Sequence, residues 1–123
     1  MTIKKLLISN RGEIASRIIK SAHDMGITCV AIYTEADKNT PYVREADQSF
    51  KLSDSYLNAK EILEIAKKNN VDAIHPGYGF LSENANFANN VKKAGIKWVG
   101  PSANAIKKMG DKITAKTLAE KAG

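Results

Sequence analysis

Short apolar runs alternate along this chain with longer segments in which apolar residues recur every three or four positions. The apolar runs predict buried parallel strands at 3–9, 28–34, 49–52, 73–74 and 97–99. The periodic segments predict amphipathic helices at 12–25, 42–46, 58–69, 83–93, 103–109 and 111–121. Strands that alternate with helices form right-handed βαβ units around a parallel sheet, so the pattern predicts an α/β protein.

Helix-ending and helix-starting residues mark several of these boundaries. Gly26 follows the first predicted helix and Gly95 follows the fourth, where glycine commonly ends a helix. Asn58 and Glu61 have the spacing of a capping box at the start of the third helix. The chain contains no internal repeat and no low-complexity segment, so we expect a single domain over residues 1–123.

The composition is typical of a globular protein in water, with 43% hydrophobic and 26% charged residues among 123. No apolar run approaches the ~20 residues that span a membrane, and Ser9 to Arg11 interrupts the first run too early for an export signal. The one cysteine, Cys29, lies inside an apolar run. We therefore expect a cytoplasmic protein without membrane association, in which Cys29 is a buried and unreactive thiol.

A net charge of +6 raises the question of nucleic-acid binding. The lysines are scattered, and pairs of them fall at predicted helix ends, where the helix dipole favours cations. These pairs are at 67–68, 92–93 and 107–108. No aromatic residues interleave with them as in proteins that bind single strands, so nucleic acid is not an expected partner.

The run His75–Asn86 follows the fourth predicted strand and has the most distinctive sequence in the chain. Gly77 and Gly79 flank Tyr78 where the strand passes into a helix. Glycine permits positive φ and a close approach of the backbone to a ligand, and ligands bind beyond the carboxyl ends of strands in open α/β sheets. We therefore expect this loop to line a binding site. His75 has no His, Cys or acidic neighbour, so it is expected to be packed and hydrogen-bonded, and no metal site is predicted.

A dinucleotide site is the first alternative for such a sheet, but it needs a glycine-rich turn after the first strand. The turn here contains one glycine, Gly12, in the string at 10–15. Glu35 and Asp37 follow the second strand and could imitate a ribose-binding acid, although acids are common at strand ends. A structural role of this turn at the helix start is favoured over a ligand role.

A second candidate site is formed by Gly110, Asp111 and Lys112. If Asp111 caps a helix, Lys112 stands in its first turn, where backbone amides and an ammonium group together attract phosphate. A lysine at a helix start is by itself usually an ordinary surface residue.

Taken together, five strings resemble the amino-terminal domain of biotin carboxylase, or of the equivalent part of acetyl-CoA, propionyl-CoA, methylcrotonyl-CoA and pyruvate carboxylases. The strings are at 10–15, 17–18, 75–87, 100–101 and 109–112, and the resemblance covers essentially the whole chain. It implies a Rossmann-like pre-ATP-grasp domain, a three-layer αβα sandwich with a parallel sheet of about five strands. The ATP-grasp and carboxyl-terminal domains of the family are not expected within this chain.

The resemblance also implies an ATP-dependent ligase. In the family, ATP and bicarbonate give carboxyphosphate, which breaks down to carbon dioxide, and biotin on a carrier protein is then carboxylated at N1′. Magnesium or manganese serves the nucleotide, and the expected partners are the biotin carboxyl carrier protein or domain, a carboxyltransferase and a second copy of the full-length enzyme. The final acceptor, acetyl-CoA in fatty acid biosynthesis for example, is chosen by a separate domain or subunit.

Six residues acquire roles from this resemblance. Lys112 contacts ATP, and Tyr78 with Gly79 lies on the biotin side of the site. The residues implied at the homodimer interface are Arg17, Lys20 and Asp24, of which the last two keep the charge of the Arg and Glu that are commoner there. By this resemblance, the metal ligands and the base for bicarbonate lie beyond residue 123. Phosphoryl transfer needs a metal and several cations around the phosphates. The chain alone is therefore expected to be inactive, with no catalytic residue of its own.

Three other functions remain open on the sequence. The same pre-ATP-grasp fold could belong to another ATP-dependent ligase, although the amino-acid sequence of 75–87 argues against it. The chain could instead be a dinucleotide-binding module, or a non-catalytic dimerisation module that uses its first helix.

Overall fold

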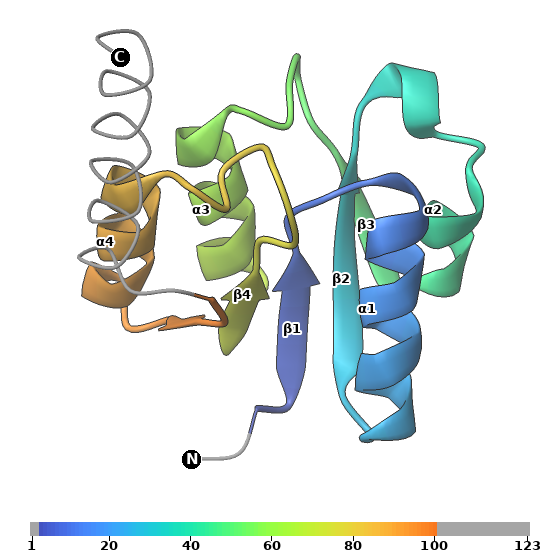
Figure 1. Ribbon diagram of the computed structural model, residues 1–123, viewed down its shortest axis with the longest axis horizontal. Helices are drawn as coiled ribbons and strands as arrows, with labels where there is room; N and C mark the ends of the chain where they lie inside the picture. Colours follow the sequence, from blue (N-terminus) through green and yellow to red (C-terminus); the bar gives the residue numbers. More distant parts are fainter. Residues whose placement is uncertain (1–2, 101–123) are drawn as a thin grey trace, which may run out of the picture.

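The computed structural model describes residues 3–100, and a five-stranded parallel sheet lies at its centre (Figure 1). The strand order is β3-β2-β1-β4-β5, and every neighbouring pair is parallel. The elements in chain order are β1 (Lys5–Ile8), α1 (Gly12–Asp24), β2 (Thr28–Tyr33), the 3-10 turn η1 (Glu35–Asp37), α2 (Pro41–Glu45), β3 (Gln48–Lys51), α3 (Ala59–Lys68), β4 (Ala73–His75), α4 (Ala85–Lys93) and β5 (Lys97–Trp98).

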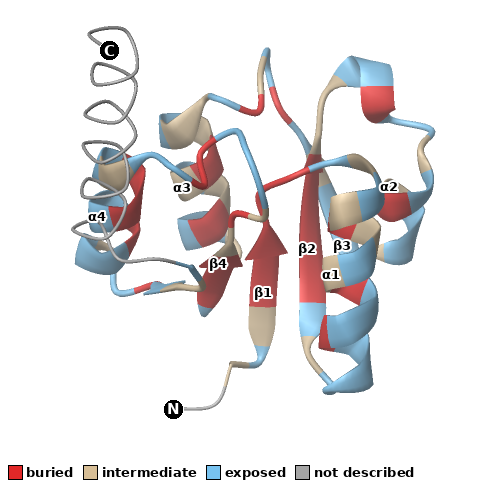
Figure 2. Cartoon of the chain, viewed as in Figure 1, coloured by how far each residue is buried: buried red, intermediate tan, exposed pale blue. Residues whose placement is uncertain are grey.

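The helices cover the two faces of this sheet, with α1 and α2 on one side and α3 and α4 on the other (Figure 1). Successive side chains of a strand point to opposite faces, so β1 contributes to both cores. Leu7 packs in the core beneath α3 and α4, whereas Leu6 and Ile8 pack in the core beneath α1. Figure 2 shows the buried positions along the central strands and the inward sides of the helices. The predicted three-layer α/β fold is confirmed.

The second strand illustrates why the apolar runs located the sheet. Four consecutive residues of β2, from Cys29 to Ile32, are fully buried. A parallel strand covered by helices on both faces needs apolar side chains in both directions, which gives a continuous run in place of an alternating one.

The fourth helix begins later than predicted. The sequence pattern places its start at residue 83, but α4 starts at Ala85, because Asn84 is its N-cap and its side chain accepts a hydrogen bond from the Phe87 amide at 2.9 Å. The backbone amide of Asn84 donates to Leu81, so the preceding residues close a turn instead. A capping side chain satisfies an amide that the helix leaves unpaired, which fixes the start of the helix.

The predicted capping box of α3 is half present. Asn58 accepts from the Glu61 amide at 3.2 Å, as the pattern requires. The Glu61 carboxylate does not return to Asn58; it accepts from the Ser53 amide at 2.7 Å and therefore ties the preceding loop to the helix.

The helices predicted at 103–109 and 111–121, together with Lys112, lie outside the described residues. Within residues 3–100, no helix has the length and apolar character needed to cross a membrane.

The strand order determines where the loops meet. β1 is the central strand, and the chain moves from it toward β2 on one side and later returns to β4 on the other. The order of the strands therefore reverses between β1 and β4, and a crevice forms beyond the carboxyl ends of the strands at such a point. The loops that follow β1, β2 and β4 converge at this edge.

Candidate functional site

The loop after β4 has a left-handed backbone at several positions. Gly77, Gly79 and Phe80 have φ of +66°, +67° and +47°. Glycine adopts this region without a steric penalty, whereas Phe80 bears the cost that a side chain adds. Tyr78 lies between the two glycines and is 77% exposed. The loop therefore presents an aromatic side chain to solvent beyond the end of β4, as predicted for residues that line a site.

Asn10 holds this loop against the end of β1. Its side chain is buried, and Nδ2 donates to the carbonyls of Pro76 at 2.8 Å and Tyr78 at 2.7 Å. Its Oδ1 accepts from the Arg11 amide at 2.9 Å. Both N–H groups and the oxygen of the carboxamide are thus hydrogen-bonded, which a buried amide requires.

The contact between Asn10 and Gly77 leaves no room for a side chain on the loop. A Cβ atom at Gly77 would lie 2.5 Å from Asn10 Nδ2. Gly79 has a similar φ, but a Cβ atom there would meet nothing within 4 Å. The first glycine is therefore required by conformation and by packing, and the second by conformation alone.

His75 occupies the last position of β4, below this loop. Its Nδ1 accepts from the Gly77 amide at 3.1 Å, so the neutral ring carries its hydrogen on Nε2. Partial burial lowers the pKa of His75. The expectation that this histidine is packed and hydrogen-bonded is confirmed.

Arg11 connects the end of β1 to the loop after β2. Its Nε and Nη2 atoms each lie 2.6 Å from an oxygen of the Asp37 carboxylate, which is buried. The Tyr56 hydroxyl donates to the same carboxylate and lies 2.6 Å from the buried hydroxyl of Tyr42. The Arg11 guanidinium is the main cause that lowers the pKa of Asp37, and the carboxylate in turn raises the pKa of Arg11. A bidentate pair of this kind has a defined geometry as well as a favourable energy.

The two acids considered for ribose binding both have cationic partners. Asp37 is occupied by Arg11 and Tyr56. Glu35 lies 2.8 Å from both Lys38 and Lys51, and their hydrogen bonds lower the pKa of Glu35 to about 2. Neither carboxylate is therefore free in the way that a dinucleotide site requires.

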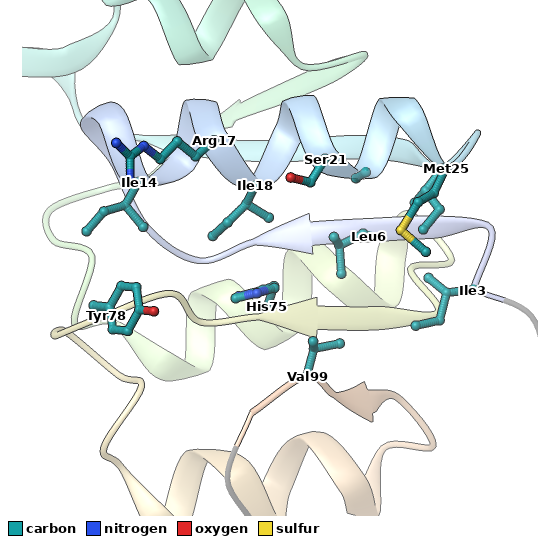
Figure 3. Close-up of a pocket in the computed structure, with 12 residues that line it drawn as sticks. Ile3, Leu6, Ile14, Arg17, Ile18, Ser21, Met25, His75, Tyr78 and Val99 are labelled. Carbon is teal, nitrogen blue, oxygen red and sulfur yellow. The ribbon is translucent and has the colours of Figure 1, made fainter.

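A largely apolar groove of about 440 Å³ runs between α1 and the strands β1 and β4 (Figure 3). Tyr78 and Ile14 line one end, and His75 lies farther along the groove. Arg17 adds a charged group on the helix side. Ile18 continues the groove along the helix. The exposed tyrosine of the loop and the first helix therefore border one continuous surface.

The three residues implied at a dimer interface share the outer face of α1. Arg17, Lys20 and Asp24 are all exposed, and their spacing of three and four residues places them on one side of the helix. Arg17 pairs with Glu13 at 3.3 Å, but both side chains are about 80% exposed, so this ion pair contributes little.

His23, which the sequence places on the solvated side of the first helix, has a partner. Its Nε2 lies 2.8 Å from the Asp47 carboxylate, and this carboxylate also accepts from the Cys29 amide at 2.7 Å. Burial raises the pKa of the Cys29 thiol to about 11. The donor atoms of these three residues lie within 4.8 Å of one another, but they are at the amino edge of the sheet, and hydrogen bonding between α1, β2 and the segment before β3 accounts for their arrangement.

The structure thus brings Tyr78 and Gly79 together with Asn10, while Lys112 lies outside the described residues. Sequence reasoning interpreted the string at 10–15 as a structural turn and missed both of its long-range contacts. The partners of Asn10 are 66 and 68 residues away, and that of Arg11 is 26 residues away. The one local signal is that two polar side chains follow directly on a buried strand.

A family model described as "Biotin carboxylase, N-terminal domain" matches residues 2–106. Biotin carboxylase 1 of Bacillus subtilis is 52% identical over 126 residues, which cover 98% of this chain and 28% of the relative. A pyruvate carboxylase subunit of Methanothermobacter thermautotrophicus is 48% identical over 124 residues, which cover 97% of this chain and 25% of the relative. The chain therefore spans about a quarter of the length of these relatives.

Solved structures agree with this likeness. The biotin carboxylase domain of Hydrogenobacter thermophilus 2-oxoglutarate carboxylase superposes with a TM-score of 0.89 at 41% identity, over 100% of this chain and 28% of that one. That structure is a domain dimer in complex with MgADP, ADP and bicarbonate.

The two glycines of the loop provide a matched test of the packing against Asn10. We expect Gly77→Ala to lower the free energy of unfolding by about 3 kcal/mol, from a left-handed alanine and a clash with Asn10. Gly79→Ala should lower it by about 1 kcal/mol, since only the cost of a left-handed backbone at alanine applies. Urea unfolding of both variants measures the difference, and equal losses would show that Asn10 moves aside without cost.

The ion pair of Asp37 should make stability depend on pH. Because Arg11 lowers the folded-state pKa of Asp37, the carboxylate stabilises the fold above its unfolded pKa of about 4, and this contribution is lost as pH falls through the lower folded pKa. At pH 7 we expect Asp37→Asn to cost about 2 kcal/mol. The difference in the free energy of unfolding between the variant and the wild type should shrink as pH is lowered from about 5 to 2 in urea titrations. Glu64→Gln, an exposed change on α3, is the control, and a difference independent of pH would contradict the prediction.

Proposed function

The chain belongs to the biotin carboxylase family as its amino-terminal domain, and from this premise we propose that the intact protein carboxylates biotin on a carrier protein with ATP and bicarbonate. Bicarbonate attacks the γ-phosphorus of ATP, which forms carboxyphosphate and releases ADP. Carboxyphosphate breaks down to carbon dioxide and phosphate. Carbon dioxide then forms a bond to N1′ of biotin, which gives up its proton. Magnesium or manganese would serve the nucleotide, with its ligands in the parts of the protein beyond this chain.

The observation that carries this proposal is the loop after β4, which hydrogen bonds hold in a defined conformation. Tyr78 is exposed at the point where the strand order reverses, and hydrogen bonds from the buried Asn10 side chain hold the main chain on both sides of Gly77. A site that must orient two reactants needs such fixed walls. The bicarbonate and MgADP bound in the Hydrogenobacter thermophilus domain are further support for the same substrates here.

We assign Tyr78 and Gly79 to the biotin side of the site and Lys112 to ATP. Residues 1–123 form the amino-terminal domain in this proposal, and the ATP-grasp and carboxyl-terminal domains belong to the rest of the intact protein, in keeping with relatives about four times as long. Glu35 and Asp37, which follow β2, are held by cations, and we assign the metal ligands to the parts of the protein beyond this chain. For the same reason the chain alone should not cleave ATP.

The acceptor of the carboxyl group is assigned to a separate carboxyltransferase. Relatives of this chain carry names that refer to pyruvate, acyl-coenzyme A and methylcrotonoyl-CoA. One amino-terminal domain therefore serves carboxylases with different acceptors, which fits a role in the half-reaction that they share. A biotin carboxyl carrier protein or domain is the other partner. We place the protein in the cytoplasm, where the single buried thiol of Cys29 would stay reduced.

The first test is ADP formation by the intact protein with and without biotin and bicarbonate. We expect dependence on both, with no activity from residues 1–123 alone. Tyr78→Ala should raise KM for biotin by about tenfold and leave KM for ATP unchanged, whereas Lys112→Ala should do the reverse. Lys60→Ala, an exposed change on α3, is the control. ADP formation that is indifferent to biotin would assign the protein to another ATP-dependent ligase.

We also propose that the outer face of α1 forms the homodimer interface of the intact protein. A two-fold interface must complement itself, and this face carries both signs of charge, on Arg17, Lys20 and Asp24. Lys20→Glu should weaken the dimer by about tenfold in sedimentation equilibrium, because it brings like charges together across the axis. Lys60→Glu makes the same charge change on α3, and equal dimerisation of the two variants would show that α1 is not the interface.

A further inference from the structure

We infer that Asn10 is a positioning residue for the biotin subsite, which acts by fixing the main chain around Tyr78 and Gly79. The inference rests on the proposed function, since it assigns a role within the same site. Asn10 need not touch the substrate. It determines where the loop that faces the substrate lies.

The hydrogen bonds of Asn10 form a two-point attachment. The two N–H groups of one carboxamide reach the carbonyls of Pro76 and Tyr78, which lie on either side of Gly77. A planar group with two fixed donors sets the direction of both carbonyls and therefore of the backbone between them. The opposite placement of the amide atoms would set an oxygen against two carbonyl oxygens, so the partners define the orientation of the carboxamide.

Asn10 is itself held on both sides. The backbone amide of Ser9 donates to the carbonyl of His75 at 2.9 Å, which continues the pairing of β1 with β4. On the other side, Arg11 is fixed by its bidentate pair with Asp37. The attachment of the loop therefore starts from the central strand of the sheet, and rigid elements of this kind hold a site more accurately than a loop alone.

The loop depends on this attachment because the Tyr78 side chain packs against little of the protein. With 77% of its surface exposed, Tyr78 does not anchor the loop through its ring. The far end is anchored by Phe80, whose ring centroid lies 5.5 Å from that of Tyr56, and by the buried Leu81. Asn10 is the corresponding anchor at the near end. A loop ordered before binding loses less conformational entropy when a ligand binds.

The chemistry of the contact identifies the variants that test it. Asn10→Asp preserves the shape but replaces the donor by an oxygen that faces the carbonyls of Pro76 and Tyr78. Asn69→Asp is a matched control, because Asn69 Nδ2 also donates to a carbonyl, that of Ile65, at 2.8 Å. Asn69 follows α3 and lies at the amino edge of the sheet, away from the loop. If Asn10→Asp does not fold, Asn10→Ser, which retains one donor on a shorter side chain, takes its place.

In the intact protein we expect Asn10→Asp to lower kcat/KM for free biotin by about tenfold, the effect of losing one or two hydrogen bonds, and to change KM for ATP by less than about twofold. Hydrogen exchange at the amides of 77–80 should become faster in the same variant. Asn69→Asp should leave the kinetics and this exchange unchanged. A merely structural defect would affect both substrates, so the difference between biotin and ATP distinguishes a positioning role.

The inference would be overturned if the Asn10 variants kept kcat/KM for biotin unchanged or lost it equally for biotin and ATP. In that case, a wild-type reaction that depends on biotin would still support the proposed function. A wild-type protein that forms ADP without regard to biotin would instead overturn the proposed function, and the biotin subsite with it.

Discussion

Asn10 and Arg11, just beyond the end of β1, hold the carboxyl edge of the sheet together from its central strand. Asn10 reaches the loop after β4 on one side, and Arg11 reaches the turn after β2 on the other. Neighbouring residues can do this because successive side chains of an extended chain point in opposite directions. The loops on the two sides of β1 are therefore held by adjacent residues.

Burial of one partner strengthens each attachment, since the Asn10 carboxamide and the Asp37 carboxylate are both buried. A buried carboxamide or carboxylate is costly unless its hydrogen-bonding groups are satisfied, and here nearly all of them are. Asp37 accepts from Arg11 and from Tyr56, whose hydroxyl also meets that of Tyr42. Alternative positions of the loops would leave these groups unpaired in the interior. The same hydrogen bonds that stabilise the edge therefore also select one geometry for it.

The loop held in this way borders an exposed surface of the domain. The exposed tyrosine, the groove beside it and the charged outer face of α1 lie at the surface of this domain. The chain spans about a quarter of the length of its relatives. Relatives that share this domain are named for different acceptors, which fits our proposal that it serves the half-reaction they have in common.

Patterns in the sequence predicted the main helices and strands of the described residues, their order and the family. Helices and strands are local patterns, since a 3.6-residue period or a short apolar run depends on neighbours in the chain. The same locality identified Gly77 and Gly79 as positions of positive φ and Asn58 as a cap. Prediction from local patterns was less accurate at the start of α4. Both Glu83 and Asn84 fit the beginning of a helix, and the actual cap depends on the preceding turn.

The partners of the polar groups depend on the tertiary structure. His23 is exposed, as its place on the polar side of the first helix suggests, but it also meets Asp47. Asp37, one of the two acids considered for ribose, pairs with Arg11. The role of Asn10 could not be predicted from the sequence, because its partners are backbone carbonyls far along the chain. Every residue has a backbone carbonyl, so no residue type marks these partners. Such contacts are set by strand order: β4 lies beside β1 although two other strands and three helices, counting the short α2, separate them in sequence.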